Sequence, residues 1–159
     1  MNELITAIIV ASILGAGLIT GLLFAFSNFV MRALADLPAD KGMFAMQRIN
    51  VAIINPIFMM LFLGTPVLCS VVTFTSIQNI NASGSLYLLI GALAYIIGPF
   101  GITMLFNVPL NNKLASADAS EANEIWSMYQ KRWQRWNHIR TYIGVVSIVF
   151  MTIGLGSIE

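Results

Sequence analysis

The sequence has few charged residues: Asp, Glu, Lys and Arg make up 9% of its 159 residues, against about 25% in an ordinary soluble domain. Hydrophobic residues make up 58%. Such a chain lacks the polar surface that a water-soluble fold needs, so we expect the lipid bilayer to be its solvent. The net charge of +1 provides no strongly basic surface, and we expect no nucleic-acid partner.

Residues that bind metals or move protons are also scarce. The chain has a single cysteine, Cys69, and a single histidine, His138, so it cannot form an intrachain disulfide. A tightly held zinc or non-haem iron needs several His, Cys or carboxylate ligands close together, and we therefore expect no metal site and no cofactor. Haem, held by His138 and a methionine, and copper stay open as alternatives.

Other catalytic and transport motifs are missing as well. No Asp or Glu falls within the long apolar runs, whereas proton pumps and ion carriers usually place a carboxylate inside the membrane. The sequence has no glycine-rich phosphate loop and no Gly-x-Ser-x-Gly nucleophile motif. These absences argue against an ion transporter, a nucleotide-binding enzyme and a serine hydrolase.

Long charge-free runs are what the sequence does have, at 4–31 and 49–112 and again after Arg140. A helix needs about 20 apolar residues to cross a bilayer, and the polar stretch 78–85 divides the second run. We predict an all-α membrane protein, a four-transmembrane-helix bundle whose fourth helix is extended by an amphipathic cytoplasmic segment. It forms one domain, 1–159, with helices over about 4–35, 51–77, 86–108 and 119–158.

The basic residues predict the orientation. All eight fall in the two long connections, at Arg32, Lys41, Arg48, Lys113, Lys131, Arg132, Arg135 and Arg140. Cytoplasmic connections carry an excess of Lys and Arg. We therefore expect an integral protein of a bacterial inner membrane, with both termini outside and the polar end on the cytoplasmic side.

Prolines interrupt the middle helices. Pro56 and Pro66 fall in the expected second helix and Pro99 in the third. A proline inside a helix removes one backbone hydrogen bond and tends to kink it. Kinks at these positions would open space between helices, although prolines are also common in ordinary spans.

The segment before the fourth span carries an aromatic stripe. Asp118 and Glu121 have the spacing of a capping box, and the sequence then reads as helix into the membrane. At 100° per residue, one face of roughly 100° holds Trp126, Tyr129, Trp133, Trp136, Asn137 and Arg140. This stripe is either an interfacial aromatic belt or a wall for a small flat aromatic ligand. His138 lies away from its centre.

Further polar residues gather at the same membrane depth, at Asn28, Arg32, Gln47, Asn50, Asn107 and Asn111. Amides in a bilayer are costly unless they are paired. Helix capping would explain one or two of them. Because there are so many, we predict that the four helices converge on a polar, aromatic-lined cavity.

Four segments in order make the chain resemble the anthrone oxygenase-like family of small four-helix membrane proteins, otherwise a domain of unknown function. The matching segments are Phe26–Met31 with Ala33-Leu34 and Leu37-Pro38; Gly42 with Ala45–Asn50; Asn107–Asn111; and Trp126, Tyr129 and Trp133 with Trp136–Thr141. The resemblance implies a membrane oxidoreductase, an oxygenase that converts an anthrone or another phenolic aromatic with dioxygen into a quinone.

The resemblance suggests roles for the polar residues. His138 would be the base, because imidazole titrates near neutral pH. Arg140 and Asn137 would stabilise the enolate oxygen, while Trp126, Tyr129, Trp133 and Trp136 stack on the rings. The remaining wall would consist of Asn28, Arg32, Gln47, Asn50, Asn107 and Asn111.

Two other functions stay open. The same cavity would suit a non-catalytic binding protein for a lipid-soluble ring compound such as a quinone or haem. Alternatively, the amphipathic 118–140 segment would dock a structural subunit onto another membrane protein. A homo-oligomer is compatible with each of these functions.

Overall fold

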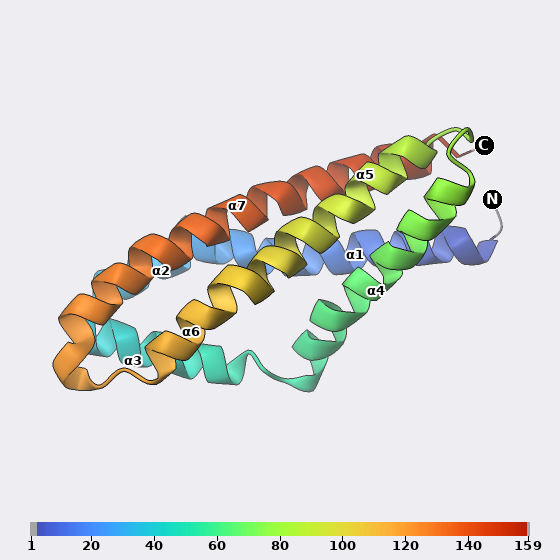
Figure 1. Ribbon diagram of the computed structural model, residues 1–159. Helices are drawn as coiled ribbons and strands as arrows, with labels where there is room; N and C mark the ends of the chain where they lie inside the picture. Colours follow the sequence, from blue (N-terminus) through green and yellow to red (C-terminus); the bar gives the residue numbers. More distant parts are fainter. Residues whose placement is uncertain (1–2, 159) are drawn as a thin grey trace.

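The computed structural model describes residues 3–158, and within this range it contains helices and no strand (Figure 1). Short connections separate four long helical rods and one shorter helix. The rods are α1 (Glu3–Ala25) with η1 (Phe26–Val30) and α2 (Met31–Ala35); α4 (Pro56–Gln78); α5 (Ser85–Tyr95) with η2 (Ile96–Asn107) and α6 (Val108–Ala115); and η3 (Ala119–Glu121) with α7 (Ala122–Gly156). The shorter helix is α3 (Ala39–Ala52).

All four rods are long and apolar enough to cross a membrane, at 33, 23, 31 and 38 residues. Large apolar side chains point outward along them, as Leu14, Leu18 and Phe74 do, each about 60% exposed. In water this surface would be unfavourable, and in a bilayer it contacts lipid. The prediction of an all-α membrane protein with four spanning helices is therefore confirmed.

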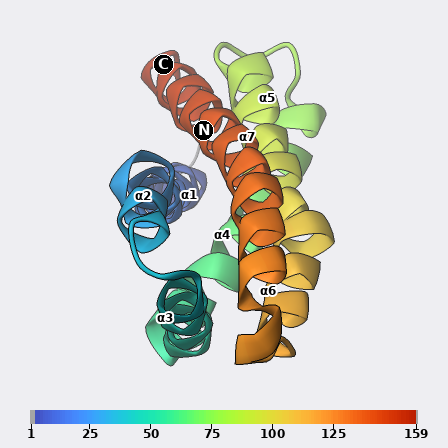
Figure 2. The same cartoon turned by 90° about the vertical axis from the view of Figure 1, so that its left-hand side faces the viewer.

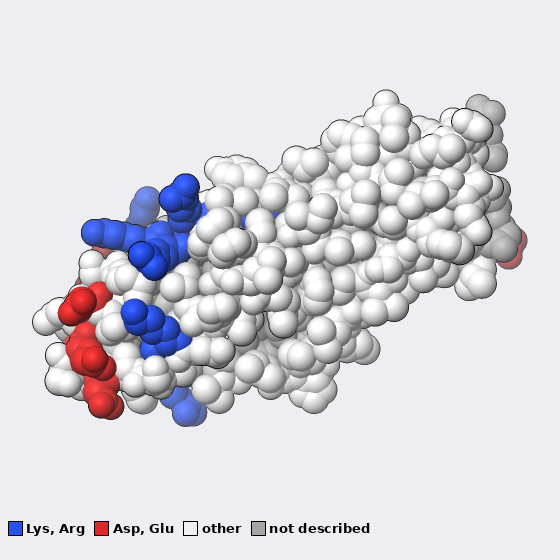
Figure 3. Space-filling view, viewed as in Figure 1, with Lys and Arg blue, Asp and Glu red and all other residues white. Residues whose placement is uncertain are grey.

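The two basic connections lie at the same end of the molecule. In Figure 1 this end holds α2, α3, α6 and the start of α7, while the start of α1 and the end of α7 lie at the other. On the face that Figure 3 shows, Lys and Arg gather at this end, with acidic side chains beyond them at the tip. The side of the membrane that this charged end faces stays a prediction.

Small residues let α5 and α7 pack closely at the other end. A Cβ atom on Gly91 would lie 2.7 Å from the backbone nitrogen of Met151, and one on Gly154 would lie 2.9 Å from the backbone nitrogen of Leu88. The Ser147 hydroxyl donates to the Gly91 carbonyl at 2.7 Å. Glycines at helix interfaces are a common device for close packing in membranes, and here they fix α5 against α7.

The start of the second span differs from the prediction. The helix predicted from about residue 51 is interrupted at 53–55, and α4 begins at Pro56 with the Asn55 side chain accepting a hydrogen bond from the Phe58 backbone at 3.1 Å. Pro56 therefore starts a helix instead of kinking one, since a proline at the first helical position lacks only a donor that would have no partner. Pro66 and Pro99 do lie inside helices.

Two rods contain π-helical turns, η1 and η2. Such wide turns are rare in proteins, and those that do occur are often found at functional sites. Viewed from the charged end in Figure 2, α1 to α3 lie on one side and α6 and α7 on the other. Asn28 lies within η1 and Asn107 within η2, so the two wide turns contain two of the polar residues predicted for the site.

Candidate functional site

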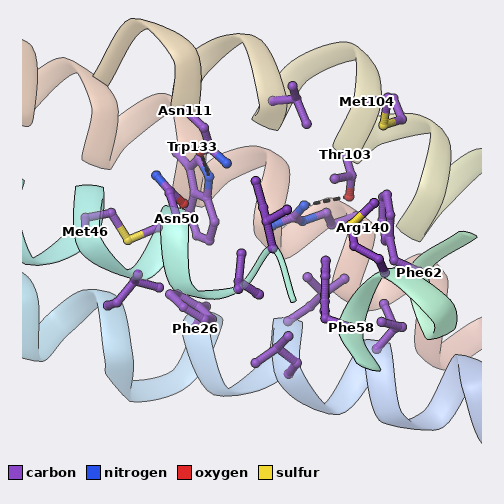
Figure 4. Close-up of a pocket in the computed structure, with 18 residues that line it drawn as sticks. Phe26, Met46, Asn50, Phe58, Phe62, Thr103, Met104, Asn111, Trp133 and Arg140 are labelled. Atoms are coloured by element: carbon purple, nitrogen blue, oxygen red, sulfur yellow. Dashed lines mark hydrogen bonds between the residues drawn. The ribbon is translucent and has the colours of Figure 1, made fainter. Parts of the chain in front are cut away.

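A cavity of about 250 Å³ lies among α1, α3, α4, η2 and α7 (Figure 4). We call it the central cavity. Its volume is just below the roughly 300–1,000 Å³ of typical ligand pockets, so it suits a small molecule. Most of its wall is apolar, and its polar residues are Asn50, Thr103, Asn111 and Arg140, with the Trp133 indole beside them.

Arg140 is the central polar residue of this site. It comes from the middle of α7 and is only 4% exposed. Its guanidinium donates to the Asn137 side-chain oxygen at 3.1 and 2.7 Å and to the Thr103 hydroxyl at 2.6 Å. The Thr103 hydroxyl donates its own proton to the Pro99 carbonyl, which leaves its oxygen free to accept from Arg140. The guanidinium is thus held rigidly between α7 and η2.

Asn137 connects Arg140 to the first rod. Its side-chain nitrogen donates to the Leu23 carbonyl at 2.8 Å and to the Ser27 hydroxyl at 2.7 Å. Because the amide oxygen is then turned toward Arg140, Asn137 acts as a positioning residue for the guanidinium. The Thr141 hydroxyl lies 3.3 Å from Ser27 and donates to the Asn137 carbonyl at 2.7 Å, which completes the contact between α7 and η1.

The charge of Arg140 has no carboxylate partner among residues 3–158, where the one ion pair joins Lys41 to Asp40 at 3.6 Å. Its carbon Cζ instead lies 5.1 Å from the centre of the Trp133 ring, within cation–π range. A buried charge without a counter-charge is costly. An anionic group in the cavity would therefore bind favourably there.

Aromatic rings continue from Arg140 toward the charged end. Trp133 stacks near Tyr129 at 6.0 Å and Tyr129 near Trp126 at 5.7 Å, with interplanar angles of 24° and 15°. Phe26 from η1 meets Trp133 at 5.5 Å. Trp133 lines the central cavity, whereas Tyr129 and Trp126 are buried behind it. Trp126 packs against Gly42 of α3, where a Cβ atom would lie 3.0 Å from its indole nitrogen.

Asparagines fix this aromatic wall. The Asn111 side-chain oxygen accepts from the Tyr129 hydroxyl at 2.8 Å and from the Trp133 indole at 2.9 Å. Asn107 donates to the Trp133 carbonyl at 3.3 Å. Gln47 donates to the carbonyls of Leu114, at 2.8 Å, and Ala117, at 3.3 Å, so it ties α3 to the end of α6. Of these amide residues, Asn111 lines the cavity.

Of the residues predicted for the site, Asn50, Asn111, Trp133 and Arg140 line the central cavity, and Asn137, Tyr129, Trp126, Gln47 and Asn107 lie behind its wall. Four others lie in neither group. His138 and Asn28 line a separate depression of about 200 Å³, together with Ser27 and Thr141. Trp136 stacks on Phe106 at 3.8 Å and does not line the central cavity. Arg32 is exposed. The structure therefore separates His138 from Arg140, and the assignment of His138 as the base stays a prediction.

Several lining residues could not be recognised from the sequence. Phe58 and Phe62 of α4 and Met104 of η2 line the cavity, but apolar residues inside a span cannot be told from lipid-facing ones by type. Thr103 carried a weak signal, as a hydroxyl four residues after Pro99 in an apolar run. A buried arginine at the same depth needs acceptors, and that need would have pointed to Thr103.

Comparison with known proteins gives one family. The model of the family described as anthrone oxygenase matches residues 58–150, which include η2, Arg140 and the aromatic stripe of α7. No curated protein matches the chain, and no solved structure matches it. Since the matched region covers more than half of the sequence and the resemblance of its motifs agrees with it, the chain belongs to the anthrone oxygenase family.

Proposed function

We propose that the protein is an oxygenase that uses dioxygen to convert an anthrone-like or phenolic aromatic into a quinone in the central cavity. The observation that carries this proposal is the buried guanidinium of Arg140, which has no carboxylate partner and borders an apolar, aromatic-lined space. An enolate or phenolate oxygen of the substrate would supply the missing negative charge. In a water-excluded site this attraction is much stronger than in water.

The chemistry follows from the substrate. The central CH₂ of an anthrone is acidic because its carbanion is delocalised onto the carbonyl oxygen. Arg140 would favour loss of the first proton by stabilising that oxygen. The electron-rich enolate then reduces dioxygen, so that one oxygen atom becomes the new carbonyl and the other leaves as water with the two hydrogens of the CH₂ group. The substrate loses four electrons and dioxygen gains four.

The proposal includes independence from a metal. The lining residues of the central cavity include no His, Cys, Asp or Glu, which are the usual protein ligands. The enolate can transfer electrons to dioxygen directly, so a cofactor is not needed for electron balance. We expect that dialysis against a chelator leaves turnover unchanged, and loss of activity that added metal restores would contradict this part of the proposal.

The alternative is a binding or carrier protein for a lipid-soluble ring compound. The lining of the central cavity contains no His, Asp or Glu that could act as a base. This favours a carrier, because a carrier needs the aromatic walls and the guanidinium but no proton acceptor. Both functions predict that a flat aromatic anion binds beside Arg140. They differ in whether its oxidation is accelerated.

The test is oxygen uptake by detergent-purified protein that is given a simple anthrone, compared with the spontaneous rate under the same conditions. We expect faster uptake, with the anthraquinone as product. Uptake at the spontaneous rate, with the ligand bound and the protein folded, would reject the oxygenase and leave the carrier.

A further inference from the structure

The central cavity is open on one side. Two of the residues that line it are exposed, Ile54 at 69% and Met104 at 45%, and every other lining residue is buried or half-buried. Ile54 belongs to the linker 53–55 between α3 and α4, and Met104 belongs to η2. The outer surface of the protein therefore reaches the cavity between this linker and η2.

Helix contacts bound this opening at both of its ends. Toward the charged end α3 packs against α6, where Gln47 donates to the Leu114 carbonyl at 2.8 Å. Toward the other end α4 packs against η2, where the rings of Phe62 and Phe100 lie 5.4 Å apart. Between these two contacts the start of α4 lies away from η2 and α6, whereas its end lies beside α5 (Figure 1). We call the opening between the linker and η2 the lateral slot.

The lateral slot faces lipid and not water. Both of its edges fall within the charge-free run 49–112. The residues beside Ile54 and Met104 are large, apolar and outward-pointing, as Ile57 and Leu105 are, at 71% and 70% exposed. In a protein that spans the membrane such a surface contacts the acyl chains of the bilayer. A molecule dissolved in the bilayer can therefore approach the cavity directly.

We propose that the central cavity exchanges its ligand with the bilayer through the lateral slot, and that Ile54 and Met104 determine the width of this passage. The inference deepens the proposed function and rests on it for the identity of the ring compound. A charged group inside the hydrocarbon layer is costly. The ligand therefore passes the slot in its neutral form, and its negative charge develops only beside Arg140.

The first test narrows the slot and measures how fast a ligand exchanges. Ile54→Phe combined with Met104→Phe places a ring on each edge. Ile57→Phe combined with Leu105→Phe is the matched control, because these neighbours are as exposed but do not line the cavity. Each protein in lipid vesicles is mixed with a hydroxyanthraquinone, and quenching of tryptophan fluorescence gives the rate constants of association and dissociation.

Narrowing the slot should lower both rate constants by about tenfold and leave the dissociation constant within about twofold, because a residue on the route changes the barrier and not the bound state. The control should change neither rate. If the doubly substituted protein does not fold, Met104→Phe alone is compared with Leu105→Phe alone.

The second test uses a charged analogue. Anthraquinone-2-sulfonate has the same rings and a negative charge that Arg140 would attract, but it stays in water. In vesicles it should associate with the wild type about a hundredfold more slowly than the neutral quinone, because its charge opposes transfer into the hydrocarbon layer.

Three results would overturn the inference: unchanged rates in the narrowed protein, equal slowing in the control, or entry of the sulfonate as fast as that of the neutral quinone. If no quinone binds to the wild type, the proposed ring compound is wrong. The slot is then tested with Met46→Cys, a buried position in the cavity wall, labelled by N-phenylmaleimide dissolved in the bilayer. Equal labelling of the narrowed and control proteins would reject the slot. Turnover enters none of these measurements, so the oxygenase and the slot can fail separately.

Discussion

Replacing Arg140 by methionine should remove most of the turnover and leave the fold intact. Methionine fills part of the same volume but carries no charge and no donor. A donor aimed at a developing oxyanion typically contributes about 3–4 kcal/mol. Because about 1.4 kcal/mol corresponds to a tenfold change in rate, we expect kcat to fall by about 10²–10³.

The stability of the same variant follows from two opposing effects. The guanidinium loses its three hydrogen bonds to Asn137 and Thr103, each contributing about 1.5–3 kcal/mol when one partner is charged. Removing a buried, unpaired charge returns several kcal/mol of desolvation cost. The two are similar in size, so the thermal midpoint in detergent should shift by only a few degrees.

Arg140→Lys is the matched variant. It keeps the charge, but one ammonium group lacks the planar fork that reaches both Asn137 and Thr103, so we expect an intermediate loss of about tenfold. Oxygen uptake with an anthrone gives the rates, and a thermal melt gives the stability. A folded Arg140→Met protein that retains turnover within about threefold of the wild type would refute the reasoning.

Three other predictions follow from the structure. A catalytic base usually contributes 10²–10⁴-fold, but His138 lies outside the central cavity, so His138→Ala should lower turnover by less than tenfold; a larger loss would restore it as the base. Gly91→Ala should destabilise the protein by about 1–3 kcal/mol in a thermal melt, because its Cβ atom would meet Met151. Gly17 has open space around it, so Gly17→Ala should melt like the wild type. Equal melting temperatures of the two variants would contradict the close packing of α5 against α7. Finally, an impermeant maleimide should label Lys41→Cys in lysed but not in intact cells if the charged end is cytoplasmic, and labelling of intact cells would reverse the orientation.

The number and type of the spanning helices could be predicted from where the charged and polar residues fall along the sequence. Inside a bilayer the backbone has no water to bind, and a helix satisfies all its backbone hydrogen bonds within one segment. Charge-free runs of sufficient length therefore predict helices. The start of the second span was hidden because its charge-free run continues through Asn55 and Pro56. Those two residues are in fact a start signal, a side-chain cap followed by a proline at the first helical position.

The site was predictable where the helix is regular. On α7, Trp126, Tyr129, Trp133, Asn137 and Arg140 are all buried on one face, as a period of 100° per residue predicts. Trp136 was assigned to the same face, but it is partly exposed and stacks on Phe106. Its position at the margin of the arc is the physical reason.

The site was less predictable on the first and third rods. The π-helical turns of η1 and η2 add residues to a turn, so positions counted at 100° per residue no longer describe which side faces inward. This explains the misplaced Asn28, which was predicted to face the cavity but lies within η1 and is exposed. Thr103 lies within η2 and faces Arg140. Sequence periodicity predicts such positions only where the helix stays regular.

The central claim is that a flat aromatic with an oxygen function binds in the central cavity beside Arg140. An experimental structure of the purified protein with a bound hydroxyanthraquinone tests it most directly. We predict the ring system against Trp133, with one oxygen within hydrogen-bonding distance of the Arg140 guanidinium. A ligand bound in the depression at His138 and Asn28, or on the lipid-facing surface, with the central cavity unoccupied, would contradict the account.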